Sequence, residues 1–152
     1  MAETKRTITR ALIVGMGQFG LSLATSLRQN HIDVLALELN KERSKIAQQV
    51  LDEVRCIDAR MKNELKELRP QDFDVCVCAI GDEAKEASMV VTAMLLEICD
   101  PPTRVLARAS TDVQEQILTS LGAHECIWPE RHYGQLFAEQ HLLPGTTSLN
   151  PD

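Results

Sequence analysis

The sequence LIVGMGQFG, residues Leu12–Gly20, is the clearest indication of how this chain folds. Its apolar run ends in Gly15-x-Gly17-x-x-Gly20, and an amphipathic helical pattern begins at once. A dinucleotide-binding fingerprint requires this strand-to-helix context, in which the three glycines allow a tight turn, close approach of a pyrophosphate and close helix packing. The helix N-terminus then offers unpaired N–H groups to phosphates. The stretch therefore predicts a nucleotide-binding loop, although glycine-rich turns of purely structural role share the pattern.

Strand-like apolar runs alternate with helical patterns six times along the chain. This alternation predicts a Rossmann-like α/β fold, a doubly wound six-stranded parallel sheet with its ligand at the carboxyl ends of the first strands. We expect one domain at residues 8–143, between a flexible lead at 1–7 and a disordered tail at 144–152. Strands are expected at 8–14, 32–38, 54–57, 73–80, 104–109 and 124–128, with a helix after each.

Local patterns make sharper predictions for three of the helices. In the helix expected at 41–51, Ile46, Ala47 and Val50 should face the core. Asp82 is the expected N-cap of the helix that follows the fourth strand. A Thr111-x-x-Gln114 capping box and a Leu121–Gly122 terminus bound the fifth helix.

Composition and charge exclude several classes of function for this 152-residue chain. A formal net charge of −6 argues against nucleic-acid partners and against binding to anionic lipid. No uncharged run approaches the ~20 residues of a membrane helix, so we expect no direct membrane insertion and assign any membrane role to a partner. The five cysteines form no C-x-x-C pair, which favours buried reduced thiols over a metal site at Cys76 and Cys78.

Glu38 ends the second predicted strand about 20 residues after the loop, where dinucleotide-binding folds carry an acid on the ribose. A carboxylate there accepts hydrogen bonds from both ribose hydroxyls and repels a 2′-phosphate, so NAD(H) or an adenine mononucleotide is favoured over NADP. A solvated acid at a strand end is the alternative. Asp58 after the third strand could accept from the adenine amino group with Ala59 packed nearby, or serve only as a turn residue.

The charged partners for a ligand's phosphates are less clear in the sequence. Gln18 is the loop residue expected nearest the phosphates, and it is uncharged. Arg43 and Arg108 are the nearest positive candidates, although Arg43 also fits the solvated side of a helix.

Patterns for catalysis are missing from the sequence. A Tyr-x-x-x-Lys reductase pair fails because Phe137 stands four residues after Tyr133, the only tyrosine, and no G-x-S-x-G elbow occurs. A nucleotide-binding domain without catalytic residues indicates sensing, so we expect no enzyme. The runner-up is the cofactor domain of an NAD-dependent oxidoreductase that lacks its catalytic half.

Together these motifs resemble the RCK/KTN domain family, also called the TrkA N-terminal domain, over roughly residues 8–142. The resemblance implies a regulatory domain of a potassium channel, uptake system or efflux antiporter, which binds NAD(H) or ATP, ADP or AMP. It also implies a cytoplasmic location, peripheral to the inner membrane through the transporter partner. The motifs that carry it are Gly15–Gly20, Glu38 with Asn40 and Arg43, Ile57–Ala59, Ala79–Glu83, Ala107–Ser110, Leu121–Ala123 and Pro129–Glu130. The nucleotide site that it implies consists of Gly15, Met16, Gly17, Gln18, Phe19, Gly20, Glu38, Leu39, Arg43, Asp58, Ala59, Ile80, Gly81 and Arg108.

The helix after Pro129 resembles the element that crosses to a neighbouring subunit in this family. That resemblance implies a homodimer or higher ring, and gives the apolar stripe of Tyr133, Leu136 and Phe137 a role; packing on its own sheet is the alternative. Glu130 matches a position that in some members faces the phosphates and can hold a divalent cation. An exposed acid at a helix start explains Glu130 equally well.

One departure from the family concerns Gln18, where members often carry arginine. Without that positive charge, NAD(H) or a mono- or diphosphate is favoured over a triphosphate.

Overall fold

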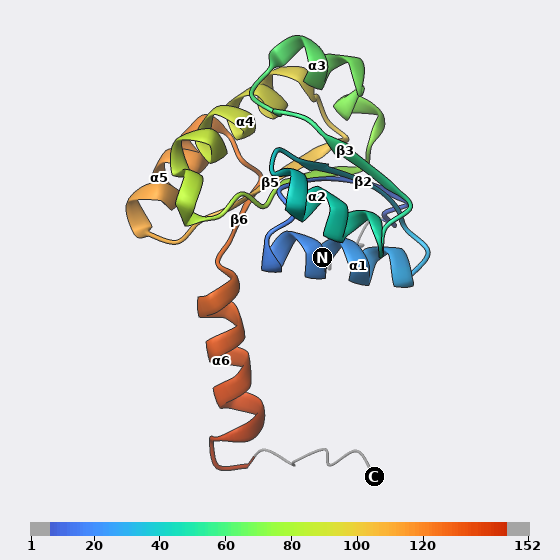
Figure 1. The fold of residues 1–152 in the computed structure, drawn as a ribbon. Coiled ribbons are helices and arrows are strands. Elements are labelled where there is room, and N and C mark those ends of the chain that lie inside the picture. The colour runs from blue at the N-terminus through green and yellow to red at the C-terminus, as the bar shows by residue number, and fades with distance from the viewer. Residues whose placement is uncertain (1–6, 146–152) are drawn as a thin grey trace.

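Six parallel strands form the centre of the molecule, in the order β3-β2-β1-β4-β5-β6 (Figure 1). A computed structural model describes residues 7–145, so the predicted lead and tail lie almost entirely outside the described residues. The order confirms the predicted doubly wound sheet, because the chain winds outward in both directions from β1 and β4. The strands are β1 (Arg10–Val14), β2 (Asp33–Glu38), β3 (Glu53–Cys56), β4 (Val75–Cys78), β5 (Arg104–Arg108) and β6 (Glu125–Ile127).

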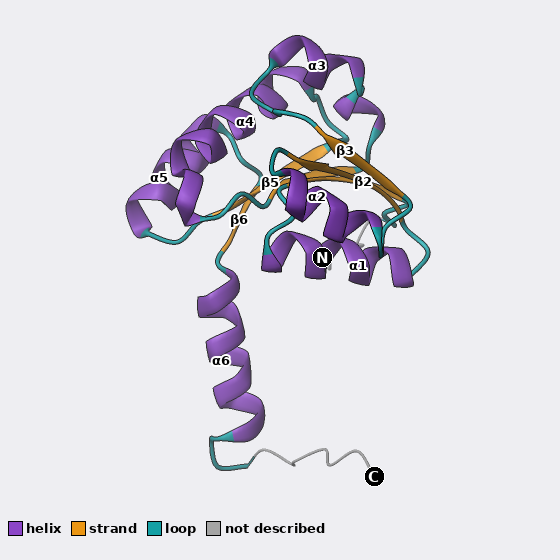
Figure 2. Cartoon of the chain, viewed as in Figure 1, coloured by secondary structure: helices purple, strands orange, loops and turns teal. Residues whose placement is uncertain are grey.

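Helices cover the two faces of this sheet in separate layers (Figure 2). One face packs on three helices through large aliphatic side chains that include Leu65, Val91 and Leu118. The other packs on α1 and α2 through small side chains such as Ala24 and Ala47, which let those helices approach closely. The helices are α1 (Gln18–Gln29), α2 (Lys41–Gln48), α3 (Lys62–Glu67), α4 (Lys85–Ile98), α5 (Asp112–Leu121) and α6 (Pro129–His141), with 3-10 turns η1 (Pro70–Asp72) and η2 (Asp82–Ala84).

The strand register aligns the ends of the three central strands. Val14 of β1 lies opposite Leu37 of β2 and opposite Cys78 of β4. The carboxyl ends of these three strands therefore meet at one edge, and β1 and β4 form the switch point where such folds bind ligands.

Two local predictions were wrong. In α2, Ala47 is buried as predicted, but Ile46 is 53% exposed because the helix buries only a narrow strip formed by Ser44 and Ala47. Val50 is 43% exposed and lies beyond the helix end at Gln48. Asp82 does not cap α4 with its side chain; it lies in η2, and its carboxylate accepts the hydroxyl hydrogen of a serine in the next strand-to-helix loop.

The fifth helix has the predicted ends. Thr111 Oγ1 accepts the Gln114 N–H at 3.1 Å, and Gly122 ends α5 with a left-handed φ of 106°. The Gln114 side chain accepts from the N–H of Ser110, one residue earlier than a capping box requires.

The prediction of buried free thiols is confirmed for Cys76, Cys78 and Cys99, whereas Cys126 is partly buried and Cys56 is exposed, so it is wrong for Cys56. Burial raises the pKa of the Cys78 thiol, as expected for a group that stays protonated and unreactive. Within residues 7–145 no group of three or more His, Cys, Asp or Glu side chains could hold a metal ion.

The last helix, α6, projects away from the body of the domain (Figure 1). It has no buried residue, and Tyr133, Leu136 and Phe137 are 64%, 38% and 41% exposed. The alternative that α6 packs on its own sheet is therefore wrong for this chain. Leu106 and Ile127, on the same sheet face as α1 and α2, stay only partly buried.

Candidate functional site

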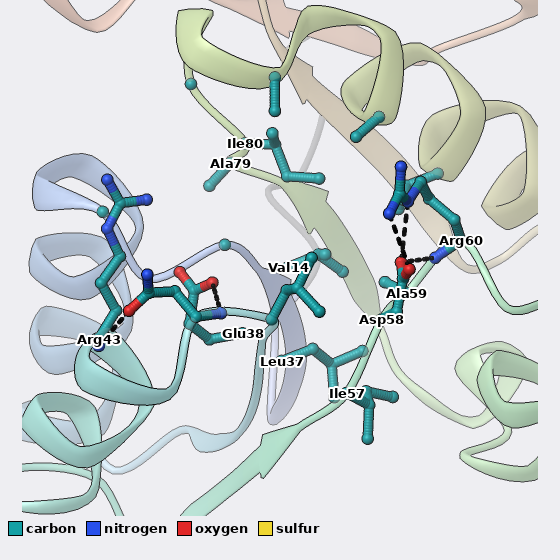
Figure 3. Close-up of a pocket in the computed structure, with 18 of the residues that line it drawn as sticks. Val14, Leu37, Glu38, Arg43, Ile57, Asp58, Ala59, Arg60, Ala79 and Ile80 are labelled. Carbon is teal, nitrogen blue, oxygen red and sulfur yellow. Dashed lines mark hydrogen bonds and ion pairs between the residues drawn. The ribbon is translucent and has the colours of Figure 1, made fainter.

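A cavity of about 320 Å³ opens at the switch point of the sheet (Figure 3). Its volume lies within the range of small-molecule sites. Figure 3 shows Glu38 and Arg43 on one side, Asp58 and Arg60 on the other, and aliphatic side chains between them. The lining residues are Val14, Gly15, Gly17, Leu37, Glu38, Leu39, Asn40, Arg43, Ile57, Asp58, Ala59, Arg60, Ala79, Ile80, Gly81, Glu83, Ala84, Ala87 and Val91.

The glycine loop has the geometry that the fingerprint predicts. Gly15 takes a φ of +98° and donates its N–H to the Leu37 carbonyl at 2.8 Å. A Cβ on Gly20 would lie 1.8 Å from the Gly15 carbonyl oxygen, so only glycine lets α1 start this close to the turn. A Cβ on Gly17 would meet nothing within 4 Å. No steric contact within the protein therefore requires glycine at position 17, and its missing side chain leaves open space beside the cavity.

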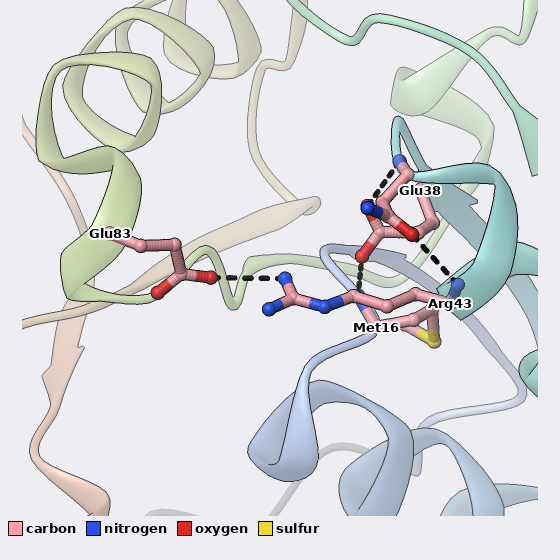
Figure 4. Close-up of polar contacts among 5 residues, drawn as sticks. Met16, Glu38, Arg43 and Glu83 are labelled. Atoms are coloured by element: carbon pink, nitrogen blue, oxygen red, sulfur yellow. Dashed lines mark hydrogen bonds and ion pairs between the residues drawn. The ribbon is translucent and has the colours of Figure 1, made fainter.

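Glu38 is buried, with 7% of its surface exposed, so the alternative of a solvated strand-end acid is wrong. Its Oε1 accepts the Met16 N–H at 3.0 Å, and its Oε2 accepts the Asn40 N–H at 2.9 Å (Figure 4). The carboxylate thus ties the glycine loop to the start of α2. Because a carboxylate has about four acceptor positions, these two bonds leave about two of them free of hydrogen bonds from the described residues.

Asp58 lines the cavity across from Glu38 and also serves as a turn residue. Its Oδ1 accepts the Arg60 N–H at 3.0 Å, and its two oxygens accept from the Arg60 guanidinium at 2.8 and 3.0 Å. Hydrogen bonding to that guanidinium lowers the pKa of the Asp58 carboxyl.

Arg43 does not simply extend into solvent, because its Nη1 forms an ion pair with Glu83 Oε1 at 3.0 Å across the cavity (Figure 4). Hydrogen bonds from the residue's own backbone N–H and from Arg43 lower the pKa of the Glu83 carboxyl. Sequence reasoning gave Glu83 no role. Two signals pointed to it: its place at the end of the Ala79–Glu83 motif and its position just beyond the end of β4.

Five predicted site residues lie outside the cavity lining: Met16, Gln18, Phe19, Gly20 and Arg108. Arg108 extends over the Phe19 ring, with 5.8 Å from its Cζ to the ring centroid, and forms an ion pair with Glu130 at the start of α6. The Arg108 Nε is buried and has no hydrogen-bond partner among the described residues. Glu130 is thus engaged by an arginine, and the structure gives no support to a cation there.

Comparisons with known proteins agree with this geometry. The TrkA-N domain family matches residues 11–129 of the chain. Uncharacterized protein MG323 of Mycoplasma genitalium is 31% identical over 81% of this chain and 52% of its own length. Ktr system potassium uptake protein A of Vibrio alginolyticus is 28% identical over 91% of this chain and 62% of its own length. The chain thus spans little more than half the length of these curated relatives.

Solved structures share the fold. The TrkA-N domain of inner membrane protein ybaL from Escherichia coli superposes with a TM-score of 0.73 at 19% identity, covering 88% of this chain and 96% of that one. The GsuK channel bound to NAD superposes with a TM-score of 0.73 at 14% identity, covering 91% of this chain and 24% of that one. GsuK bound to ADP gives a TM-score of 0.68 at 15% identity, over 88% and 35% of the two chains.

Proposed function

Because the chain belongs to the TrkA-N domain family, we propose that it is a nucleotide-binding regulatory domain of a potassium transport system. The observation that carries this proposal is the cavity at the switch point, bounded by the glycine loop and the buried Glu38. Two further facts support it: a relative is a Ktr potassium uptake protein, and the GsuK channel of the same fold was solved with NAD and with ADP.

The ligand is NAD(H) or an adenine nucleotide, bound with its adenosine half in the cavity. Its phosphates lie over the loop near Gly17, where the N-terminus of α1 adds unpaired N–H groups and a positive dipole end. Its ribose hydroxyls donate to the two free acceptor positions of Glu38. Its adenine lies between the ends of β3 and β4, within reach of Asp58 and beside Ala59 and Ile80.

The domain acts on a membrane potassium channel, uptake system or antiporter, from the cytoplasmic side of the inner membrane. Support comes from the Ktr relative and not from the chain's own surface. No helix within residues 7–145 is long and apolar enough to cross a membrane.

Two copies pair through α6, as a homodimer or as part of a ring. The exposed Tyr133, Leu136 and Phe137 support this pairing, because an apolar stripe on a helix that leaves its own domain needs a second surface to bury it. The partly buried Leu106 and Ile127 offer such a surface on a second copy. The Arg108–Glu130 ion pair joins the ligand end of β5 to α6, which gives the pocket a route to the paired copies.

A thermal-shift series with NAD, NADH, AMP, ADP and ATP tests the proposal. A ligand that binds only the folded state raises Tm by mass action. At a ligand concentration of 100 times Kd, the free energy of unfolding rises by about 2.7 kcal/mol. We expect at least one of the five to raise Tm in wild type and not in Glu38→Ala. If none of the five ligands raises the Tm of wild type at millimolar concentration, the proposal is wrong. Steady oxidation of NADH with a small carbonyl compound would instead favour the oxidoreductase alternative.

A further inference from the structure

Arg43 and Glu83 face one another from opposite sides of the cavity. Arg43 belongs to α2 and Glu83 to η2, and their side chains meet across the mouth, 45% and 57% exposed (Figure 4). Both residues line the cavity. A ligand lying along the glycine loop therefore passes beneath this ion pair or displaces it.

Glu83 lies between the two arginines nearest the loop. Its Oε1 accepts from Arg43, and its Oε2 folds back over Gly81, where an added Cβ would lie 2.5 Å away. The same Cβ position is 3.4 Å from Arg108 Nη1, so the second arginine lies close to the same carboxylate. Glu83 thus offsets the positive charge that a ligand phosphate would otherwise meet. The chain has no loop arginine to replace it, since position 18 is glutamine.

We propose that Glu83 sets the phosphate-charge preference of the nucleotide pocket by holding Arg43 across its mouth and competing with ligand phosphates for that arginine. The inference rests on the proposed function, because it concerns the same pocket. A half-exposed ion pair contributes little stability, so a phosphate can displace it. Glu83 then repels the phosphate, and the repulsion grows with each added negative charge. Adenosine carries no charge and binds without disturbing the pair.

Calorimetric titration of adenosine, AMP and ADP into wild type and Glu83→Gln tests this competition at low ionic strength. We expect Glu83→Gln to tighten AMP binding about threefold and ADP binding about tenfold, since one unit charge at close range changes affinity several-fold even in water. Adenosine affinity should change less than about twofold. Arg43→Gln should weaken the binding of AMP and ADP. In the Arg43→Gln background, Glu83→Gln should raise their affinities by a smaller factor than it does in wild type. At about 1 M salt, with a Debye length near 3 Å, the gains should shrink.

A matched control is available at the far edge of the sheet. The Arg104–Glu125 pair has a 3.1 Å contact and exposures of 49% and 58%, nearly those of the Arg43–Glu83 pair. Glu125→Gln removes the same unit charge far from the cavity and should leave all three affinities unchanged. Glu83→Ala, a second variant, should show the same order of gains if Glu83→Gln folds poorly.

The outcomes separate the two proposals. If wild type binds these ligands but Glu83→Gln changes adenosine, AMP and ADP equally, Glu83 has no role in charge preference, while the nucleotide-binding function stands. If wild type binds NAD(H) but neither AMP nor ADP, the role of Glu83 is overturned while the nucleotide-binding function stands; if wild type binds neither NAD(H) nor any adenine nucleotide, both proposals are overturned.

Discussion

Replacing Glu38 by alanine should destabilise the ligand-free domain as well as abolish nucleotide binding. The buried carboxylate accepts the backbone N–H groups of Met16 and Asn40 at 3.0 and 2.9 Å. A buried N–H group that loses its partner costs about 1–3 kcal/mol. Asn40 lies in a partly buried contact that water can reach, so most of the cost comes from Met16. We expect a total loss of about 2–3 kcal/mol, which lowers Tm by about 5–10 °C for a domain of this size.

Thermal melting of the ligand-free protein, followed by circular dichroism, measures this loss. Glu125→Ala is the control, because Glu125 is an exposed acid at the opposite edge of the sheet and its removal should change stability by less than about 0.5 kcal/mol. Equal Tm values for Glu38→Ala and wild type would refute the reasoning. The carboxylate would then contribute nothing to the free protein, and its burial would have no structural cause.

Three further predictions follow from the loop, the last helix and an acidic ion pair. Gly20→Ala should lower both Tm and nucleotide affinity, because its Cβ would lie 1.8 Å from a backbone carbonyl. Gly17→Ala, a change at the N-cap of α1, should lower the free energy of unfolding by only about 1 kcal/mol and still abolish binding. Melting and titration of both variants check this contrast, and equal effects would contradict it. Phe137→Asp should convert a dimer into a monomer in analytical ultracentrifugation, while a wild type that is monomeric at all concentrations would contradict pairing through α6. The Arg60 guanidinium lowers the pKa of Asp58 in the folded state, so this pair stabilises the protein above about pH 4, and the contribution disappears as pH falls through the lowered pKa. Arg60→Gln should therefore flatten the decline of Tm between about pH 4 and pH 2. An unchanged decline would show that the pair has no effect on stability.

The fold and the loop could be predicted because their causes are local in sequence. Alternating strand and helix periods indicate a parallel sheet, and the Gly15-x-Gly17-x-x-Gly20 spacing indicates the turn at its switch point. The α2 face was mispredicted for a non-local reason. A helical period cannot tell that Ile46 and Val50 lie beyond the narrow strip that α2 presents to the sheet.

The polar part of the site depends on residues that meet only after folding. Glu38 was found from its spacing to the loop, yet its contact with the Met16 N–H requires the paired ends of β1 and β2. Glu83 was missed because its partner, Arg43, lies 40 residues earlier and on another helix. The stripe of α6 was visible as a pattern, but no pattern states which surface buries it.

Calorimetric titration of ADP and NADH into wild type and Glu38→Gln tests whether the cavity at the switch point binds nucleotides. Glutamine keeps the side-chain volume but loses the charge, and its NH2 group donates where one carboxylate oxygen accepted. We predict saturable binding with one ligand per chain in wild type and at least about tenfold weaker binding in the variant, equivalent to about 1.4 kcal/mol. Absence of binding to wild type, or equal affinity in the two proteins, would contradict it.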